Sequence, residues 1–330
     1  MPISASFRRA IPAASCSPAV VDKRSRGKRA WKGKPNGMDP LLELLLNAVV
    51  AGLLLGAFYA AVAVGIAIAF GMLDIPNLAH PAFVVMGAFA VWLLNDAFGL
   101  DPILAGILCL PPFFLLGVLL YQAYYACFES RGDNALQGLA FFFGILFVTE
   151  VVLILVIGAD YRTVAAPYIG PNWRIGGIDL PLRMLVPALV SLLMIGGLHL
   201  LLTRSFIGRA ILAVSQDPLA LQLMGASPVR TKRLAFGLSI ATAAIAGALL
   251  IIIQPVEPSI GREFIGRAFA VVVLGGMGSF VGMLMAAMVL GVTESLVATL
   301  FSPSWAPAIA FGFLLPTLAI RAGGLMGRKL

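Results

Sequence analysis

The side chains of this sequence that could do chemistry are acids placed inside long apolar stretches. Glu150 stands within Phe147-Val-Thr-Glu-Val-Val-Leu, and Glu294 lies near the end of the apolar run 264–300, while Arg267 and Asp74 lie nearer the ends of their runs. Such charges are costly in lipid and usually face a bundle interior or water. Each acid either lines a path for a solute or has a structural role, as the partner in an interhelical hydrogen bond or as a protonated, packed carboxyl group, and the sequence leaves both interpretations open.

A second polar group follows a proline in the sequence Ile75-Pro-Asn77-Leu-Ala-His80. His80 is able to contact a solute or to respond to pH. The simpler interpretation is that it satisfies backbone groups freed by a broken helix, and Pro76 and Asn77 fit the same break.

Glycines mark a second break, because Gly275, Gly276, Gly278 and Gly282 cluster within one apolar run. Transporters place binding sites where helices are discontinuous, since the freed backbone groups can contact the solute. The two breaks, at 74–81 and 275–282, lie in opposite halves of the chain and suggest an internal repeat. The predicted residues of a translocation path are Asn77, His80, Glu150, Glu294, Gly275 and Gly278.

The elements that position these residues are membrane spans. Of the 330 residues 60% are apolar and 12% are charged, about half the charged share of a soluble domain. Spanning lipid takes ~20 helical residues. The runs that qualify are 41–72, 78–95, 102–127, 136–158, 184–203, 232–255, 264–300 and 305–321. The first and seventh are long enough to be tilted or broken, so we expect an all-α bundle of eight or nine spans.

The net charge of +8 comes entirely from residues 1–37, which hold nine basic residues and one acid. We expect this segment, rich in Ser, Pro, Gly and Lys, to be a disordered extension rather than a nucleic-acid ligand, although contact with anionic lipid fits its charge. Alternatively Met38 is the true start. Residues 38–330 then form a single permease domain.

The sequence lacks the residue patterns that several classes of function require. Three cysteines and two histidines offer no metal spacing and no disulfide framework, and no phosphate-binding loop occurs. Neither paired acids nor a Ser/His arrangement stands at catalytic spacing. We therefore predict a protein without enzyme activity, metal or cofactor, and if transport is powered by ATP another polypeptide binds the nucleotide.

Orientation follows from Lys and Arg in the loops. The 204–233 loop holds five basic residues and one acid, and the C-terminus adds Arg321, Arg328 and Lys329, so both are predicted to be cytoplasmic. Counting spans back from this loop places 159–183 outside. It also places the basic N-terminus outside, although basic segments normally stay on the cytoplasmic side. Three explanations of this conflict are open: 76–95 is re-entrant, 41–72 holds two elements, or the start of the sequence is wrongly assigned.

Local signals within that loop agree on a short helix. Asp217 suits the N-cap, Pro218 the first helical position, and Gly225 a left-handed end. Leu219, Leu223 and Met224 are apolar in a segment that should face water. The helix is either a surface element tucked against the membrane or a rigid knob that docks into a partner.

Three blocks in order resemble the permease subunits of high-affinity branched-chain amino acid importers of the ATP-binding-cassette class. They are Gly52-Leu-Leu-Leu-Gly56-Ala-Phe-Tyr59-Ala with Ile75–His80, the loop containing Gly208-Arg209, Asp217 and Leu223-Met-Gly225, and Ala270-Val-Val-Val-Leu-Gly275-Gly-Met-Gly278-Ser through Gly291-Val-Thr-Glu294. The resemblance covers Met38 to about Gly327. The spacing of Gly52 and Gly56, and of Gly282 and Ala286, also predicts close helix contacts.

The resemblance implies an importer permease fold with discontinuous helices in a bacterial inner membrane. It also implies two ATPase subunits, a second related permease and a periplasmic solute-binding protein as partners. Asp217–Gly225 would be the coupling helix, seated in an ATPase subunit. The chain departs from the family at Asn77-Leu-Ala-His80-Pro81-Ala82, where an acid is lost and proline replaces glycine, and at Glu150, where a neutral polar residue is expected.

Two matters stay open. The cargo is a branched-chain amino acid, urea, a short amide or a similar small solute. The alternative function is an ion-coupled secondary transporter that uses Glu150 or Glu294 as a proton carrier.

Overall fold

The computed structural model describes residues 39–131, 135–175, 178–276 and 278–320. These residues belong to one compact unit. The predicted disordered extension and the basic C-terminal residues Arg321, Arg328 and Lys329 lie outside the described residues.

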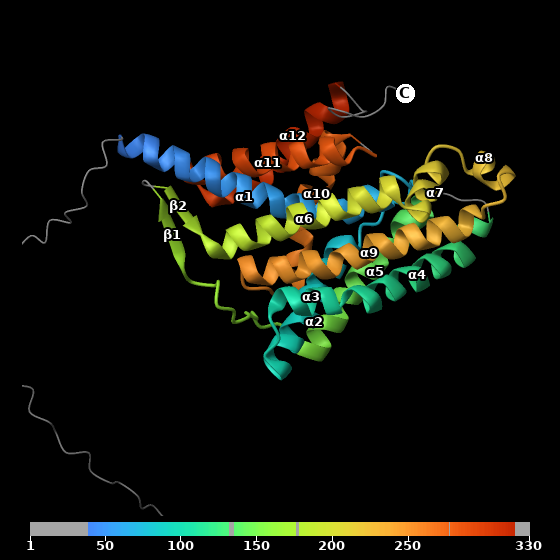
Figure 1. The fold of residues 1–330 in the computed structure, drawn as a ribbon, viewed down its shortest axis with the longest axis horizontal. Coiled ribbons are helices and arrows are strands. Elements are labelled where there is room, and N and C mark those ends of the chain that lie inside the picture. The colour runs from blue at the N-terminus through green and yellow to red at the C-terminus, as the bar shows by residue number, and fades with distance from the viewer. Residues whose placement is uncertain (1–38, 132–134, 176–177, 277, 321–330) are drawn as a thin grey trace, which may run out of the picture. The chain divides into compact units, whose positions relative to one another are not determined.

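The described chain folds into a helical bundle (Figure 1). Its α-helices are α1 (Pro40–Ala69), α2 (His80–Phe98), α3 (Pro102–Leu108), α4 (Leu110–Cys127), α5 (Ala135–Ile157), α6 (Leu182–Arg204), α7 (Phe206–Val214), α8 (Pro218–Leu223), α9 (Pro228–Ile253), α10 (Gly261–Gly275), α11 (Phe280–Leu300) and α12 (Ala306–Ile320). Short 3-10 turns cover Glu129–Arg131, Pro258–Ile260 and Pro303–Trp305. The strands β1 (Asn172–Ile175) and β2 (Ile178–Pro181) pair antiparallel.

Seven of the described helices are long and apolar enough to cross a membrane: α1, α2, α4, α5, α6, α9 and α11. Two further apolar helices, α10 and α12, have 15 residues each, and at ~1.5 Å per residue they fall short of a full crossing. The polytopic all-α fold is confirmed, and the expected count of eight or nine spans was approximate because it included these short helices.

The two long apolar runs differ. Residues 264–300 are broken as predicted, because α10 ends at Gly275, Gly276 and Gly278 have φ of +93° and +86°, and α11 begins at Phe280. The run 41–72 instead forms one continuous 30-residue helix. The explanation of the N-terminal orientation in which this run holds two elements is therefore wrong. Its apolar residues continue without a helix-breaking signal up to Gly71.

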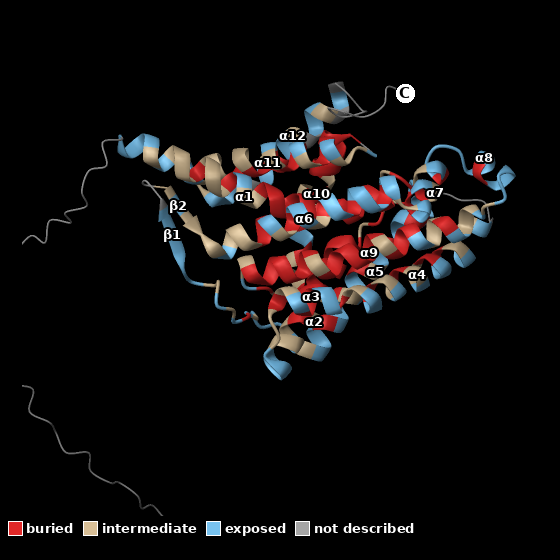
Figure 2. Ribbon diagram, viewed as in Figure 1, coloured by how far each residue is buried: buried red, intermediate tan, exposed pale blue. Residues whose placement is uncertain are grey.

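Helices α9 and α1 form the centre of the bundle, and α4 and α5 lie at its edge (Figure 2). Helix α9 packs against α1, α2, α3, α4 and α6. The predicted glycine ridge on α1 is confirmed, since a Cβ at Gly52 would lie 2.5 Å from Val292 Cα and one at Gly56 2.7 Å from the Ala287 carbonyl oxygen, both on α11. The missing side chains let the two backbones meet, which is how helices pack in lipid.

The bundle has two distinct ends. The β1–β2 hairpin lies at one end beside the first turns of α1, where Asn47 accepts a hydrogen bond from Asp179 N at 2.8 Å and Glu43 pairs with Arg174 at 3.7 Å. Helices α7 and α8 lie at the opposite end (Figure 1). The loop predicted to be outside and the loop predicted to be inside therefore emerge at opposite ends, and α1 begins at the hairpin end.

Candidate functional site

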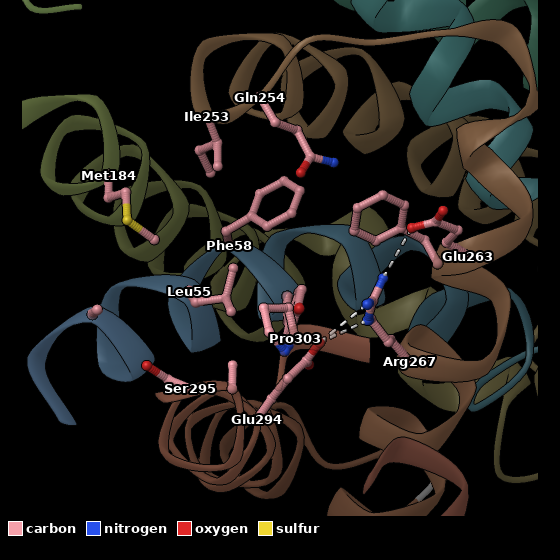
Figure 3. Close-up of a pocket in the computed structure, with 14 residues that line it drawn as sticks. Leu55, Phe58, Met184, Ile253, Gln254, Glu263, Arg267, Glu294, Ser295 and Pro303 are labelled. Carbon is pink, nitrogen blue, oxygen red and sulfur yellow. Dashed lines mark hydrogen bonds and ion pairs between the residues drawn. The ribbon is translucent and has the colours of Figure 1, made fainter. Parts of the chain in front are cut away.

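A cavity of about 320 Å³ opens among five helices in the half of the bundle nearer the hairpin. Helix α10 contributes Glu263, Phe264 and Arg267, and α11 contributes Glu294 and Ser295. Ala298 of α11 also lines the cavity. The remaining walls come from α1, α6, the end of α9 and the turn after α11, with the residues Ala51, Leu55, Phe58, Tyr59, Met184, Ile253, Gln254 and Pro303. Figure 3 shows the charged side chains gathered on one side and Leu55, Phe58 and Ile253 on the other.

An arginine held between two acids forms the polar wall. Both Nη2 and Nε of Arg267 lie 3.1 Å from Glu294 Oε1, and Arg267 Nη1 lies 3.8 Å from Glu263 Oε2 (Figure 3). The Arg267 and Glu294 side chains are 13% and 5% exposed, whereas Glu263 is 65% exposed. The first pair is therefore buried within the chain, whereas Glu263 is exposed.

Aromatic rings complete the setting of Arg267. Its guanidinium carbon lies 5.5 Å from the Phe264 ring centre and 5.9 Å from that of Tyr59, within range of cation–π attraction. The Tyr59 hydroxyl approaches the Glu294 carboxylate. Even so, Glu294 Oε2 is buried without a well-aligned hydrogen bond from any described residue. A buried acceptor in that condition is costly and favours a ligand or water that donates to it.

Glu150 stands at a different place. On α5 it accepts a hydrogen bond from Arg262 Nε at 2.8 Å and pairs with the Arg262 guanidinium, which also lies 5.4 Å from the Phe147 ring centre. Arg262 is in the first turn of α10. The short helix α10 is thus tied by one arginine to α5 and by the other to α11, and Glu150 lies outside the cavity that contains Glu294.

His80 and Asn77 lie in the core. His80 is fully buried and packs on Gly65 of α1, where a Cβ would collide with the imidazole and lie 2.7 Å from Thr242 Oγ1 of α9. Asn77 Oδ1 accepts a hydrogen bond from Ala79 N at 3.1 Å, just before α2 begins. That contact organises the turn, as expected for Asn77, whereas neither ring nitrogen of His80 makes a well-aligned hydrogen bond with the described residues. A role in a solute path stays a prediction for both residues.

The connection after α1 and the break between α10 and α11 meet in space, a contact that the suggested internal repeat did not predict. A Cβ at Gly71, which follows α1, would lie 2.8 Å from Gly278 N, and one at Gly278 would lie 3.5 Å from Gly71 O. Gly275 is equally crowded, since its Cβ would lie 2.5 Å from the Met283 backbone. Gly275 therefore serves close backbone packing, and Gly278 allows the left-handed backbone, φ +86°, at the junction of α10 and α11.

Helix α8, the short helix of the 204–233 loop, has the predicted capping residues at both ends. Asp217 Oδ1 accepts hydrogen bonds from Leu219 N at 2.9 Å and Ala220 N at 3.0 Å, Pro218 opens α8, and Gly225 has φ of +84°. Leu221 is 7% exposed and anchors the helix. Leu219, Leu223 and Met224 are 66%, 83% and 86% exposed, so α8 presents an apolar face at the end of the bundle.

A hydrogen-bonded cluster supports α8 from behind. Lys232 Nζ lies 2.7 Å from Glu129 Oε1, and Tyr121 donates a hydrogen bond of 2.9 Å to Glu129 Oε2. Glu129 and Lys232 line a cavity of about 640 Å³ together with Leu219, Gln222 and the turn after α8. The pair joins the end of α4 to the start of α9, which connects the loop helix to two spans.

The opposite loop is packed on α2 and α3. Asn95 Nδ2 donates to the Ala165 carbonyl at 3.2 Å, and Arg162 lies 4.7 Å from the Trp92 ring centre. Tyr168 donates to Asp101 Oδ1 at 3.3 Å, and burial, aided by the Asp101 carboxylate, raises the pKa of the Tyr168 phenol. These contacts fix the loop without building a catalytic arrangement.

Sequence reasoning missed the cation of the cavity. Arg267 was placed near the end of its run, and Glu263 and Tyr59 were not considered as site residues. The signal was present as Arg262-Glu263-Phe-Ile-Gly-Arg267, in which an acid and a base four residues apart interrupt an apolar stretch. Of the six predicted path residues, Glu294 lines the cavity.

Comparison with known proteins gives one consistent result. A family model described as the permease component of a branched-chain amino acid transport system matches residues 48–318. The high-affinity branched-chain amino acid transport system permease protein BraD of Pseudomonas aeruginosa is 29% identical over 300 residues, covering 86% of this chain and 96% of BraD. LivH of Escherichia coli K12 is 26% identical, with coverage of 86% and 96%.

Two more distant similarities were found. LivM of Escherichia coli K12, also a permease protein of the high-affinity branched-chain amino acid system, is 29% identical over 265 residues, covering 72% of this chain and 61% of LivM. Among solved structures, PsaBC from Streptococcus pneumoniae in complex with Fab matches with a TM-score of 0.43 and 14% identity, covering 85% of this chain and 91% of that one.

Proposed function

The chain belongs to the family of branched-chain amino acid transport permease components, and on that premise we propose that it is the membrane subunit of an ATP-driven importer. It is a multi-pass membrane protein and a transport subunit rather than an enzyme. Its cargo is a branched-chain amino acid or a similarly small solute, which it carries across a bacterial inner membrane.

The observation that carries the proposal is the loop helix. α8 is capped at its start by Asp217 and closed by a left-handed Gly225, so it is rigid although it has six residues. Its exposed apolar residues Leu219, Leu223 and Met224 have no cover among the described residues. A separate ATPase subunit is the partner that an importer requires at this end, because the chain has no phosphate-binding loop.

Coupling through α8 has a structural route. Helix α7 and the pair Glu129–Lys232 connect α8 to α6, α4 and α9, and α9 is the most buried span. A rigid displacement of α8 is therefore transmitted to the centre of the bundle rather than absorbed by a flexible loop. The remaining partners proposed are a second, related permease and a periplasmic solute-binding protein; relatives of both the LivH and LivM kinds match this chain.

Co-purification tests the docking of α8. The chain is co-expressed with the ATPase subunits of its transport system, in the original form and with both Leu223→Glu and Met224→Glu. We expect the ATPase to co-purify with the original chain and to be lost from the double variant. The matched control is Gln216→Glu, an exposed residue of the same loop outside α8, which should retain the partner. Retention by the double variant would contradict the docking proposal.

A further inference from the structure

The polar wall of the cavity has an unbalanced charge. Its charged lining residues are Arg267, Glu263 and Glu294, which together carry a formal charge of −1. Glu294 is already paired with Arg267 at 3.1 Å, so the acid in excess is the exposed Glu263, 3.8 Å from Arg267. A cationic group that enters the cavity meets an acid that is available.

The other wall is apolar and the space is small. Leu55, Phe58, Met184 and Ile253 line the side facing the charged cluster (Figure 3). The volume of about 320 Å³ lies at the lower end of the range of ~300–1,000 Å³ found for small-molecule sites. The cavity therefore suits a compact solute that has one charged end and one apolar end.

Glu294 supplies an independent sign of a ligand. Its side chain is 5% exposed and lines the cavity, and its Oε2 receives no well-aligned hydrogen bond from the described residues, although the Tyr59 hydroxyl is near. Burying such an acceptor is unfavourable unless a donor arrives. An ammonium group offers three N–H donors, enough for both Glu263 and this oxygen.

We propose that this cavity binds the zwitterionic head group of an apolar amino acid. The solute carboxylate bonds to Arg267, its ammonium group bonds to Glu263 and to Glu294 Oε2, and its side chain lies against Leu55 and Phe58. This assignment rests on the proposed transport function and deepens it by naming the residues of this chain that hold each end of the solute.

Exchange of ion pairs makes such a site suitable for transient binding. Arg267 has two acidic partners, and a planar guanidinium can turn part of its donor set to a new carboxylate. The ammonium group then replaces Arg267 as the partner of Glu263. The net charge of the cavity stays at −1 whether the solute is present or absent, because a zwitterion adds none. A deaminated acid breaks this balance because it adds a negative charge to a cavity that already has one.

The experiment uses the assembled transporter and a single reactive cysteine. Cys16, Cys109 and Cys127 are replaced by Ser, and Ala298, which lines the cavity, is replaced by Cys. Labelling of A298C by a thiol reagent is timed with L-leucine, 4-methylpentanoate or urea present. T299C, at the next, exposed position, is the matched control. We expect L-leucine to slow labelling at A298C several-fold, urea and 4-methylpentanoate to have little effect, and T299C to be unaffected.

Glu263→Gln separates a binding role from a structural one, because this exposed side chain can be changed without burying a new group. We expect the concentration of L-leucine that gives half protection to rise about tenfold, which corresponds to ~1.4 kcal/mol. Protection by 4-methylpentanoate should become stronger in the same variant, since the cavity is then neutral. Opposite shifts for the two probes exclude a general loss of structure.

Three results would overturn the assignment: no protection by L-leucine, equal protection by urea, or the same shift for both probes in Glu263→Gln. ATP-driven uptake by the same preparation tests the transport function separately. Uptake without protection at A298C overturns this site alone. Protection without ATP-driven uptake supports the site and overturns the importer proposal.

Discussion

Gly71 and Gly278 meet at the point where the chain is broken twice, so closely that a methyl group on Gly71 would lie 2.8 Å from Gly278 N. Gly71 follows α1 and Gly278 precedes α11, two helices that pack along much of their length. The start of the connection between α1 and α2 therefore meets the connection between α10 and α11.

This contact predicts that Gly71→Ala destabilises the protein. The new methyl group meets backbone atoms, which cannot move away as a flexible side chain does, and overpacking of this kind costs ~1–3 kcal/mol. Thermal unfolding in detergent measures the loss. The control is Gly196→Ala in α6, where nothing lies within 4 Å of the added atom, and there the better helix propensity should leave stability equal or higher. Equal melting temperatures for the original chain and Gly71→Ala would contradict the contact.

The buried ion pair of the cavity predicts a large effect for one acid and a small effect for its neighbour. Glu294→Gln leaves Arg267 without its desolvated partner, and loss of one member of a buried pair costs ~3–5 kcal/mol. Glu263 is 65% exposed, so Glu263→Gln should cost under ~1 kcal/mol. Unfolding of the two variants side by side measures the difference. Similar losses for both would show that the burial of the Arg267–Glu294 pair is not what stabilises it.

Two glycines on α1 predict the strength of its contact with α11. Gly56→Val should weaken this contact strongly, because its Cβ would lie 2.7 Å from the Ala287 carbonyl oxygen and 2.8 Å from Met288 Cα. The expected readout is a lower yield of folded protein and a lower melting temperature. Gly144→Val in α5, with no atom within 4 Å of an added Cβ, is the comparison position. A tolerated Gly56→Val would mean that α1 and α11 are farther apart than described.

The cap of α8 predicts a loss of coupling without a loss of fold. Asp217→Ala removes both hydrogen bonds to the first turn, a change that costs ~1 kcal/mol of helix stability. Solute-stimulated ATP hydrolysis should fall while the melting temperature of the bundle changes little. Asp217→Asn, which can still cap the helix, should retain most of the stimulation. If Asn and Ala variants behave alike, the cap is not the property that matters.

Hydropathy and local chemistry predicted most of the fold. The long spans were found because lipid requires about 20 continuous apolar helical residues, and α8 was found because Asp217, Pro218 and Gly225 act on their immediate neighbours. The hairpin was missed although Trp173, Ile175, Ile178 and Leu180 alternate around two glycines, a recognisable signal for a tight turn. The apolar setting of the chain drew attention to helices alone.

The candidate cavity was predicted only in part because the residues that line it are distant from one another in sequence. Glu294 attracted attention as an acid in an apolar run, yet its pairing with Arg267 depends on how α10 folds back beside α11. Glu150 looked equivalent, and its partner Arg262 lies 112 residues away, at a separate place on α10. Tertiary packing decides which buried acid faces a cavity, and spacing within one helix cannot supply that information.

Transport by the reconstituted assembly tests the central claim most directly. The chain, its partner permease, the ATPase subunits and the solute-binding protein are placed in vesicles, and uphill accumulation of L-leucine is followed with and without ATP on the ATPase side. We predict accumulation that requires ATP and is lost with the Leu223→Glu and Met224→Glu double variant. Uphill accumulation by this chain alone, in vesicles without nucleotide, would contradict the account.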